Sequence, residues 1–319
     1  MGILSKLRRH AAVSSGNFAS MFKDVDIPPL PAAVTRLVAE INKPEPDIDR
    51  LVGLISSTPE ITVKVIKTVN SALFGLRSPV SNIKHAITLL GFQQIRAIAL
   101  AFATMDSLPK PEGDLFDHEA FWTDSLLQAM LSRSFSKKRF AAQSEDVFTA
   151  SLLADVALPV LLCAWREYYE PVIEEWRLSA KRLSEIEREH FGWDHAQAGA
   201  WILRLWEFPE EMVCYVGAHN LVRDEIIAHE LNDTMIVPMA VAALSSGVLK
   251  ADIQNAEEVF GAAIQWLSMN ETEFTDCMLE AKMSLSEVLE LFGLKESKAG
   301  PVLDELSAVA DNRHGEGEV

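Results

Sequence analysis

Apolar side chains recur at helical spacing along almost the whole chain, and this periodicity restricts the fold more than any other feature. One stripe of the segment 30–41 carries five such residues: Leu30, Val34, Leu37, Val38 and Ile41. Residues three and four apart share one face of a helix, whereas a strand would alternate every second residue. No segment shows a strand pattern of consequence. The sequence therefore predicts an all-α fold of short helices joined by tight turns, which is typical of compact helical lobes.

Capping residues predict where several helices begin. Asp47 and Asn82 each precede an apolar-periodic segment, and such side chains accept hydrogen bonds from the free N–H groups of a first helical turn. Pro59 fits the first turn of another helix, where its missing N–H is not needed. Asp194 is the expected cap of a helix that runs to Trp206.

Longer helices are predicted beyond residue 115, over 116–140 and 144–165. The second contains the longest apolar segment, but Asp155 lies in its middle, so we interpret it as a core helix. No run of about 18 apolar residues lacks charges, and we predict no membrane span. In a shorter helix that follows, Ser184 and Glu187 match a capping box.

A stretch rich in proline and glycine at 107–117 looks like a joint between two lobes. We therefore predict an amino-terminal extension, a first helical lobe, a second lobe, carboxy-terminal helices that pack on the bundle, and a disordered tail. These parts cover residues 1–24, 25–110, 111–225, 226–310 and 311–319. The extension mixes basic and apolar residues, and we favour a docking or capping helix there over a membrane-surface helix.

The charge of the chain disfavours one class of partner. Its formal net charge is −17 and its pI is about 4.9, and such a field repels phosphate backbones, so we expect no direct nucleic-acid binding. The three cysteines are far apart and form no CxxC pair. Reduced thiols in a cytoplasmic protein are the expected state.

Four ordered motifs in the first lobe carry a resemblance to a known family. They are Leu30-Pro31, then ISSTP at 55–59, NSALFG at 70–75 and AITLLG at 86–91. They resemble the LPxLP, IxxDP, NSAxYG and AIxxLG motifs of the HD-related output domain (HDOD) family. The resemblance continues through FWTDS at 121–125, SLLAD at 151–155 and the segment 192–220, and covers roughly residues 25–220.

The resemblance implies that the second lobe is similar to the HD superfamily of metal-dependent phosphohydrolases. Those enzymes cluster His and Asp ligands around divalent metals that activate water. This chain departs from the pattern at decisive places. Asp124 stands where the first His is expected, and Ala154 replaces the His of the His-Asp pair. Ala157 and Leu158 occupy the Gly-Lys positions, and Asn220 replaces a late His.

The surviving candidates form a vestigial HD pocket of four residues: Asp124, Asp155, His195 and His219. Their structural interpretation is simple, since Asp155 can accept a buried hydrogen bond from His195 or Ser125. His219 lies near a helix end, where positive charge is favourable. We therefore expect no catalytic residue, no metal and no cofactor.

The resemblance implies a bacterial signal-transduction role. We predict a non-catalytic output or scaffold module that acts through regulatory or signalling protein partners. Two alternatives stay open. One is a metal-dependent phosphohydrolase that uses the four pocket residues, and the other is a nucleotide-binding sensor without turnover.

Overall fold

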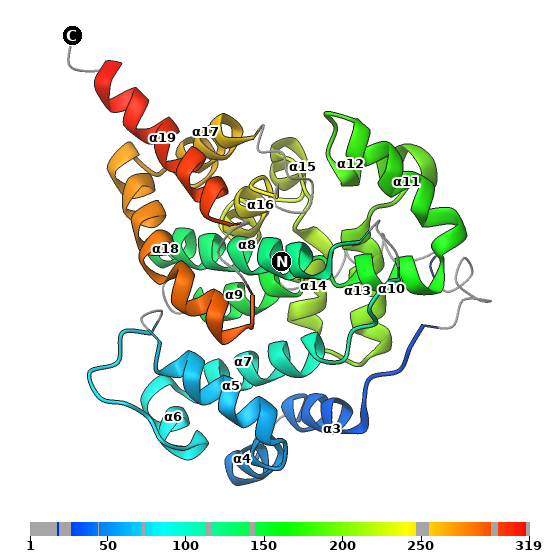
Figure 1. Cartoon of the computed structure of the whole chain (residues 1–319), viewed down its shortest axis with the longest axis vertical. Helices are drawn as coiled ribbons and strands as arrows, with labels where there is room; N and C mark the ends of the chain where they lie inside the picture. Colours follow the sequence, from blue (N-terminus) through cyan, green and yellow to red (C-terminus); the bar gives the residue numbers. More distant parts are fainter. Residues whose placement is uncertain are drawn as a thin grey trace. The chain divides into compact units, whose positions relative to one another are not determined.

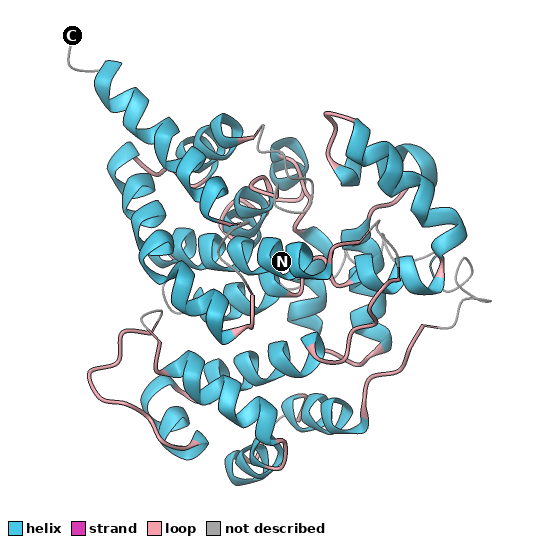
Figure 2. Ribbon diagram, in the orientation of Figure 1, coloured by secondary structure: helices cyan, strands magenta, loops and turns pink. Residues whose placement is uncertain are grey.

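The computed structural model describes residues 18, 27–43, 45–71, 74–112, 116–140, 144–246, 255–294 and 299–316. These residues form helices joined by turns and contain no strand (Figures 1 and 2), which confirms the predicted all-α fold. The chain divides into two compact units. The first combines Met1–Phe116 with Leu153–Ala218, and the second combines Asp117–Leu152 with His219–Val319.

The amino-terminal part of the first unit is a cluster of five helices whose apolar stripes face one another. The helices are α3 (Ala32–Ile41), α4 (Ile48–Ser56), α5 (Pro59–Val69), α6 (Ile83–Leu90) and α7 (Phe92–Met105). Helix α7 packs on α3, α5 and α6, and its residues from Ala97 to Thr104 are all buried. It is therefore the central helix of this cluster.

The predicted helix starts in this cluster are confirmed. The Asp47 side chain accepts hydrogen bonds from the backbone N–H groups of Asp49 and Arg50 at the start of α4. Asn82 accepts one from His85 N–H at the start of α6. Pro59 is the first residue of α5, where no N–H is required.

The remainder of the first unit consists of helices that carry most of the candidate site. They are α10 (Ala157–Ala164), α11 (Arg166–Leu178), α12 (Leu183–Phe191), α13 (His195–Leu205) and α14 (Glu210–Ala218). Helices α13 and α14 pack closely because small residues line their contact. A Cβ atom on Gly217 would lie only 2.9 Å from the Cβ of Ala200, which is closer than two such atoms can approach.

The second unit is built around α8 (His118–Arg139), in which every residue from Ala120 to Ser136 is buried. Helix α8 packs against α9 (Ser144–Leu152), α16 (Ile236–Ala243) and α18 (Glu271–Leu291). The other helices of this unit are α15 (Arg223–Ala228), α17 (Ala256–Trp266) and α19 (Gly300–Glu316). A helix that is buried on all sides must pack against segments far away in the sequence, and α16 and α18 are such segments for α8.

One expected helix is two helices. The segment predicted as a single helix over 144–165 breaks into α9 and α10, with a turn from Leu153 to Val156 between them. Pro159 explains the break, because it has no N–H to bond the carbonyl of Asp155 in a continuous helix. It lies instead in the first turn of α10. Within the described residues, Asp146–Ala164 is the one segment long and apolar enough to cross a membrane, and 83% of it is buried inside the protein.

The two compact units differ from the consecutive lobes expected from the sequence, because each unit combines two separate stretches of chain. The break inside 144–165 is the place where the chain passes from one unit to the other. The expected disordered tail also begins inside a helix, since α19 is described as far as Glu316. Residues 1–17 and 19–24 of the predicted extension, and 317–319 of the tail, lie outside the described residues.

Candidate functional site

The candidate site lies where α12 ends and α13 begins. Gly192 ends α12 with a φ of +75°, a left-handed conformation that favours glycine. The chain then turns through Trp193, and Asp194 caps α13 by accepting a hydrogen bond from Gln197 N–H, as predicted. His195 is therefore the first residue of α13, and it is directed back toward α12.

Asp194 is fixed from two sides, which makes the start of α13 rigid. Its Oδ1 accepts the Gln197 N–H at 3.1 Å, while the Gln197 side chain accepts the Asp194 N–H at 3.0 Å. Its Oδ2 accepts from Arg188 Nε at 2.8 Å and pairs with the other end of the same guanidinium at 2.6 Å. This reciprocal arrangement satisfies N–H groups that a helix start otherwise leaves without partners.

His195 lies between two carboxylates. Its Nδ1 is 2.6 Å from Glu187 Oε2, and its Nε2 is 3.1 Å from Asp155 Oδ1. The Glu187 carboxylate also accepts the backbone N–H of His195 at 2.9 Å. Asp155 comes from the turn before α10 and Glu187 from α12, so three separate segments of the first unit meet at one imidazole.

Glu187 is the most deeply buried member of this cluster, with an exposed fraction of 0%. Its second oxygen, Oε1, accepts a hydrogen bond from the hydroxyl of Tyr169 on α11. A buried carboxylate is stable only when charge and hydrogen bonds compensate for its lost hydration. Here His195 and Tyr169 supply both. Burial, followed by the charge of Glu187, raises the pKa of Tyr169 well above its usual range, so the phenol keeps its proton.

The environment of His195 favours the protonated imidazole. Burial acts to lower the pKa of the imidazole, but the charge of Glu187 and the hydrogen bonds of Asp155 and Glu187 outweigh it. The result is a pKa well above the ordinary value of 6.5. An imidazolium donates from both ring nitrogens, which matches a carboxylate oxygen next to each one. We call the chain of Asp155, His195, Glu187 and Tyr169 the buried carboxylate–histidine chain.

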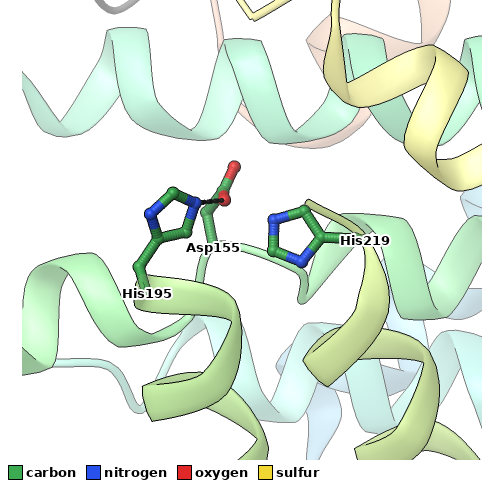
Figure 3. Close-up of side chains that lie close together, drawn as sticks. All are labelled: Asp155, His195 and His219. Carbon is green, nitrogen blue, oxygen red and sulfur yellow. Dashed lines mark ion pairs between the residues drawn. The ribbon is translucent and has the colours of Figure 1, made fainter. Parts of the chain in front are cut away.

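His219 is the third residue with a ligand-type atom at this place. It directly follows Ala218, the last residue of α14. One ligand atom each of Asp155, His195 and His219 lies within 4.8 Å of the others. Figure 3 shows these three side chains close together. His219 is buried, with 2% of its surface exposed.

Asp124 has a different environment. It lies on α8 and is 3% exposed, and its Oδ2 accepts a hydrogen bond from the Ser246 hydroxyl at 2.9 Å. Ser125, a suggested donor to Asp155, instead donates to the carbonyl of Phe121 at 3.0 Å. Of the four predicted pocket residues, three are thus gathered in the only group of potential ligands found among the described residues, and Asp124 is not part of that group.

The resemblance to HD enzymes implies a metal, and the donor set can be tested against it. A catalytic zinc site needs three protein ligands that are deprotonated. Asp155, His195 and His219 match that number, but His195 has a carboxylate at each ring nitrogen and holds its proton. A metal at Nε2 would displace that proton, and Asp155 Oδ1, 3.1 Å away, would lie at the separation of two ligands on one ion. Three donors match a single ion, so they do not fit the two-metal centre of the HD superfamily.

Glu187 is the residue that sequence reasoning misplaced. Ser184 and Glu187 do not form the predicted capping box, because α12 begins at Leu183 and Glu185 bonds the N–H of Arg182 there. One signal could have located Glu187 correctly. It lies four residues after Leu183 and next to Ile186, on the apolar face of its helix. An acidic residue on a core-facing stripe indicates a buried ion pair.

The asparagine of the first-lobe motif has a structural role. Asn70 ends α5, and its side chain holds both backbone polar groups of Val80. Its Nδ2 donates to Val80 O at 2.8 Å, and its Oδ1 accepts Val80 N–H at 2.6 Å. The residue fixes the course of the chain between α5 and α6.

Comparison with known proteins agrees with the motifs. The HDOD domain family model matches residues 27–222, which is more than half of the chain. A curated relative from Treponema pallidum (strain Nichols), an uncharacterized protein, is 22% identical over 206 residues. That match covers 61% of this chain and 38% of the relative, so the chain spans well under half the length of that protein.

Solved structures show the same fold at low sequence identity. An HDOD domain protein of unknown function from Geobacter sulfurreducens has a TM-score of 0.65 at 20% identity, covering 89% of this chain and 99% of its own. A protein from Shewanella amazonensis SB2B, for which phosphohydrolase activity is proposed, has a TM-score of 0.60 at 19% identity, with coverages of 92% and 98%. A protein from Marinobacter aquaeolei VT8, with a proposed signal-transduction role, has a TM-score of 0.54 at 17% identity, with coverages of 97% and 66%.

Proposed function

Because the chain belongs to the HDOD domain family, we propose that it is a signalling module that acts without catalysis, by binding protein partners. The buried carboxylate–histidine chain is the observation that carries this proposal. Both ring nitrogens of His195 are engaged by carboxylates of the protein itself. A proton on the imidazole, held between Asp155 and Glu187, supplies positive charge where an HD enzyme would hold a metal.

The residues next to the buried carboxylate–histidine chain indicate that this part of the protein packs helices together. Ala154, Ala157 and Leu158, which stand at the His and Gly-Lys positions of the enzymes, are at most 4% exposed. Ala154 has a methyl group where the enzymes have a histidine ligand. Leu158 has an isobutyl group where they have the lysine that would contact phosphate. The net charge of −17 also opposes the approach of a phosphate ester. Asp155, Glu187 and His195 join the start of α10 to α12 and α13 within the first unit.

The test is metal content and turnover of the purified, untagged full-length protein. Elemental analysis after growth in metal-replete medium is combined with assays on a generic phosphodiester and a cyclic dinucleotide. The proposal predicts substoichiometric metal and no turnover above buffer. Asp155→Ala serves as the site variant, and Asp233→Ala as its control, because the Asp233 side chain is 86% exposed.

The rival function is a metal-dependent phosphohydrolase, and the grouping of Asp155, His195 and His219 is what favours it. Stoichiometric metal and turnover, both lost in Asp155→Ala and both retained in Asp233→Ala, would establish the rival and overturn the proposal. If neither is found, the search moves to protein partners captured by the intact chain.

A further inference from the structure

Phe18 lies in the amino-terminal extension, before the part of the chain that matches the HDOD family. Its ring is nonetheless among the most completely buried of the described residues, with 1% exposed. It contacts Trp193 edge to face, with centroids 5.0 Å apart, and stacks against Trp201 at 6.2 Å. A phenylalanine from the extension thus occupies an aromatic site on the first unit.

The two tryptophans belong to the start and the middle of the α13 region. Trp193 is in the turn that leads to His195, and Trp201 is on α13 itself. Their described ring contacts include Phe18, which belongs to the same unit.

The aromatic site continues toward the surface. Trp193 stacks on Trp165 and Phe191 at 5.8 and 5.0 Å, and Trp165 stacks on Tyr168 at 5.0 Å. Tyr168 is 56% exposed, whereas Trp193 is 6% exposed. The rings therefore form a continuous series that is open to solvent at one end and filled by Phe18 at the other.

A second contact holds the chain after the extension to the same helix. The indole N–H of Trp206, which ends α13, donates to the carbonyl of Pro28 at 3.1 Å. Phe18 is thus held by Trp193 and Trp201, at the start and in the middle of the α13 region, and Pro28 by Trp206 at its end. Charge also favours this docking. Residues 1–26 contain four Lys or Arg and two Asp, in a chain whose net charge is −17.

We propose that Trp193 and Trp201 form a peptide-binding site for an aromatic side chain, and that Phe18 is its intramolecular occupant. Phe18 binds reversibly and, when released, uncovers an aromatic surface at the helix that begins with His195. This inference goes beyond the proposed function and does not depend on it, since the site binds the segment whether or not the protein is an enzyme.

The experiment uses full-length protein and a fluorescein-labelled peptide with the sequence of residues 1–26. In Phe18→Ala the site is vacant, while in the wild type the attached segment competes with the added peptide. Fluorescence anisotropy should give a Kd at least about tenfold lower for Phe18→Ala than for the wild type. The same peptide with Ala in place of Phe18 should not bind either protein. Leu178→Ala, which truncates an apolar side chain that is 92% exposed, should behave as the wild type.

Equal binding of the two peptides by a folded Phe18→Ala protein would overturn the proposal, and so would no binding of either. Circular dichroism and gel filtration establish whether this variant is folded. If it is not, Phe18→Leu keeps most of the apolar volume and loses the ring. That variant should bind the Phe18 peptide more tightly than the wild type does, and failure of the folded Phe18→Leu protein to do so would equally refute the proposal.

Discussion

Glu187 binds His195 twice, through the imidazole Nδ1 at 2.6 Å and through the backbone N–H at 2.9 Å. One carboxylate oxygen therefore holds both the charge and the main chain of the residue that begins α13. The interaction joins two consecutive helices on either side of the Gly192 turn. It makes Glu187 a structural residue of the site, although nothing in the HD pattern pointed to it.

Glu187→Ala is expected to lower the free energy of unfolding by about 3–5 kcal/mol, because it leaves a buried imidazolium with one carboxylate and removes the acceptor of Tyr169. Urea denaturation followed by circular dichroism measures this. Glu189→Ala on the same helix is the control. Glu189 is 54% exposed and pairs with Lys181 at the surface, so its loss should cost no more than about 1 kcal/mol. Similar effects of the two substitutions would contradict a buried ionic role for Glu187.

Stability is expected to fall as the solution becomes alkaline. Burial lowers the pKa of His195, but the two neighbouring carboxylates raise it well above the usual value. The folded protein then binds a proton that the unfolded chain releases near pH 6.5. The stabilisation is fully present below about pH 6.5 and is lost as the pH rises through the folded pKa.

The measurement for this prediction is the urea unfolding free energy between pH 6 and 9. It should decrease across the interval in the wild type and decrease less steeply in Glu187→Gln, which lacks the strongest charge on the imidazole. Tyr169 does not interfere, since its pKa is raised well above its usual range. A free energy that rises with pH over this interval in the wild type, or an unchanged slope in Glu187→Gln, would show that His195 is neutral in the fold.

Local signals in the sequence predicted local structure well. The caps at Asp47, Asn82 and Asp194 act within three residues of themselves, so neighbouring sequence was enough to place them. The all-α class follows in the same way from periodicity. Asp155 and His195 were singled out from sequence, because the family motifs fix their positions along the chain.

Long-range features escaped sequence reasoning for a physical reason. Pro159 accounts for the break between α9 and α10, but only packing reveals that the two helices belong to different compact units. Glu187 matched a surface capping pattern, and its burial depends on Tyr169, 18 positions earlier. The position of Glu187 on the apolar face of α12 indicates burial, but its partners are decided by tertiary contacts, which periodicity does not encode.

The close approach of α13 and α14 gives a steric prediction. Gly217→Ala should destabilise the protein by about 1–3 kcal/mol, because its Cβ would lie 2.9 Å from Ala200 Cβ and the helices would have to separate. Thermal unfolding measures the effect. Gly53→Ala on α4 is the matched control, since its Cβ would meet nothing within 4 Å. A mid-helix Ala is favoured over Gly by up to about 1 kcal/mol, so this control should be neutral or stabilising. Equal destabilisation by both would mean that the contact is not tight.

Asn70 offers a test of the structural role of the first-lobe motif. Its amide donates to Val80 O and accepts Val80 N–H, and Val80 is 3% exposed. Asn70→Ala should cost about 1–3 kcal/mol, because two buried backbone groups lose their partner. Asn70→Asp should lower the free energy of unfolding at least as much as Asn70→Ala does. The carboxylate still accepts the N–H, but its second oxygen would face the carbonyl oxygen of Val80.

Asn82→Ala is the control, because it removes a single cap hydrogen bond and should cost about 1 kcal/mol. If Asn70→Asp matched the wild type in chemical denaturation, the amide donor to Val80 O would contribute nothing, and the motif would need another explanation.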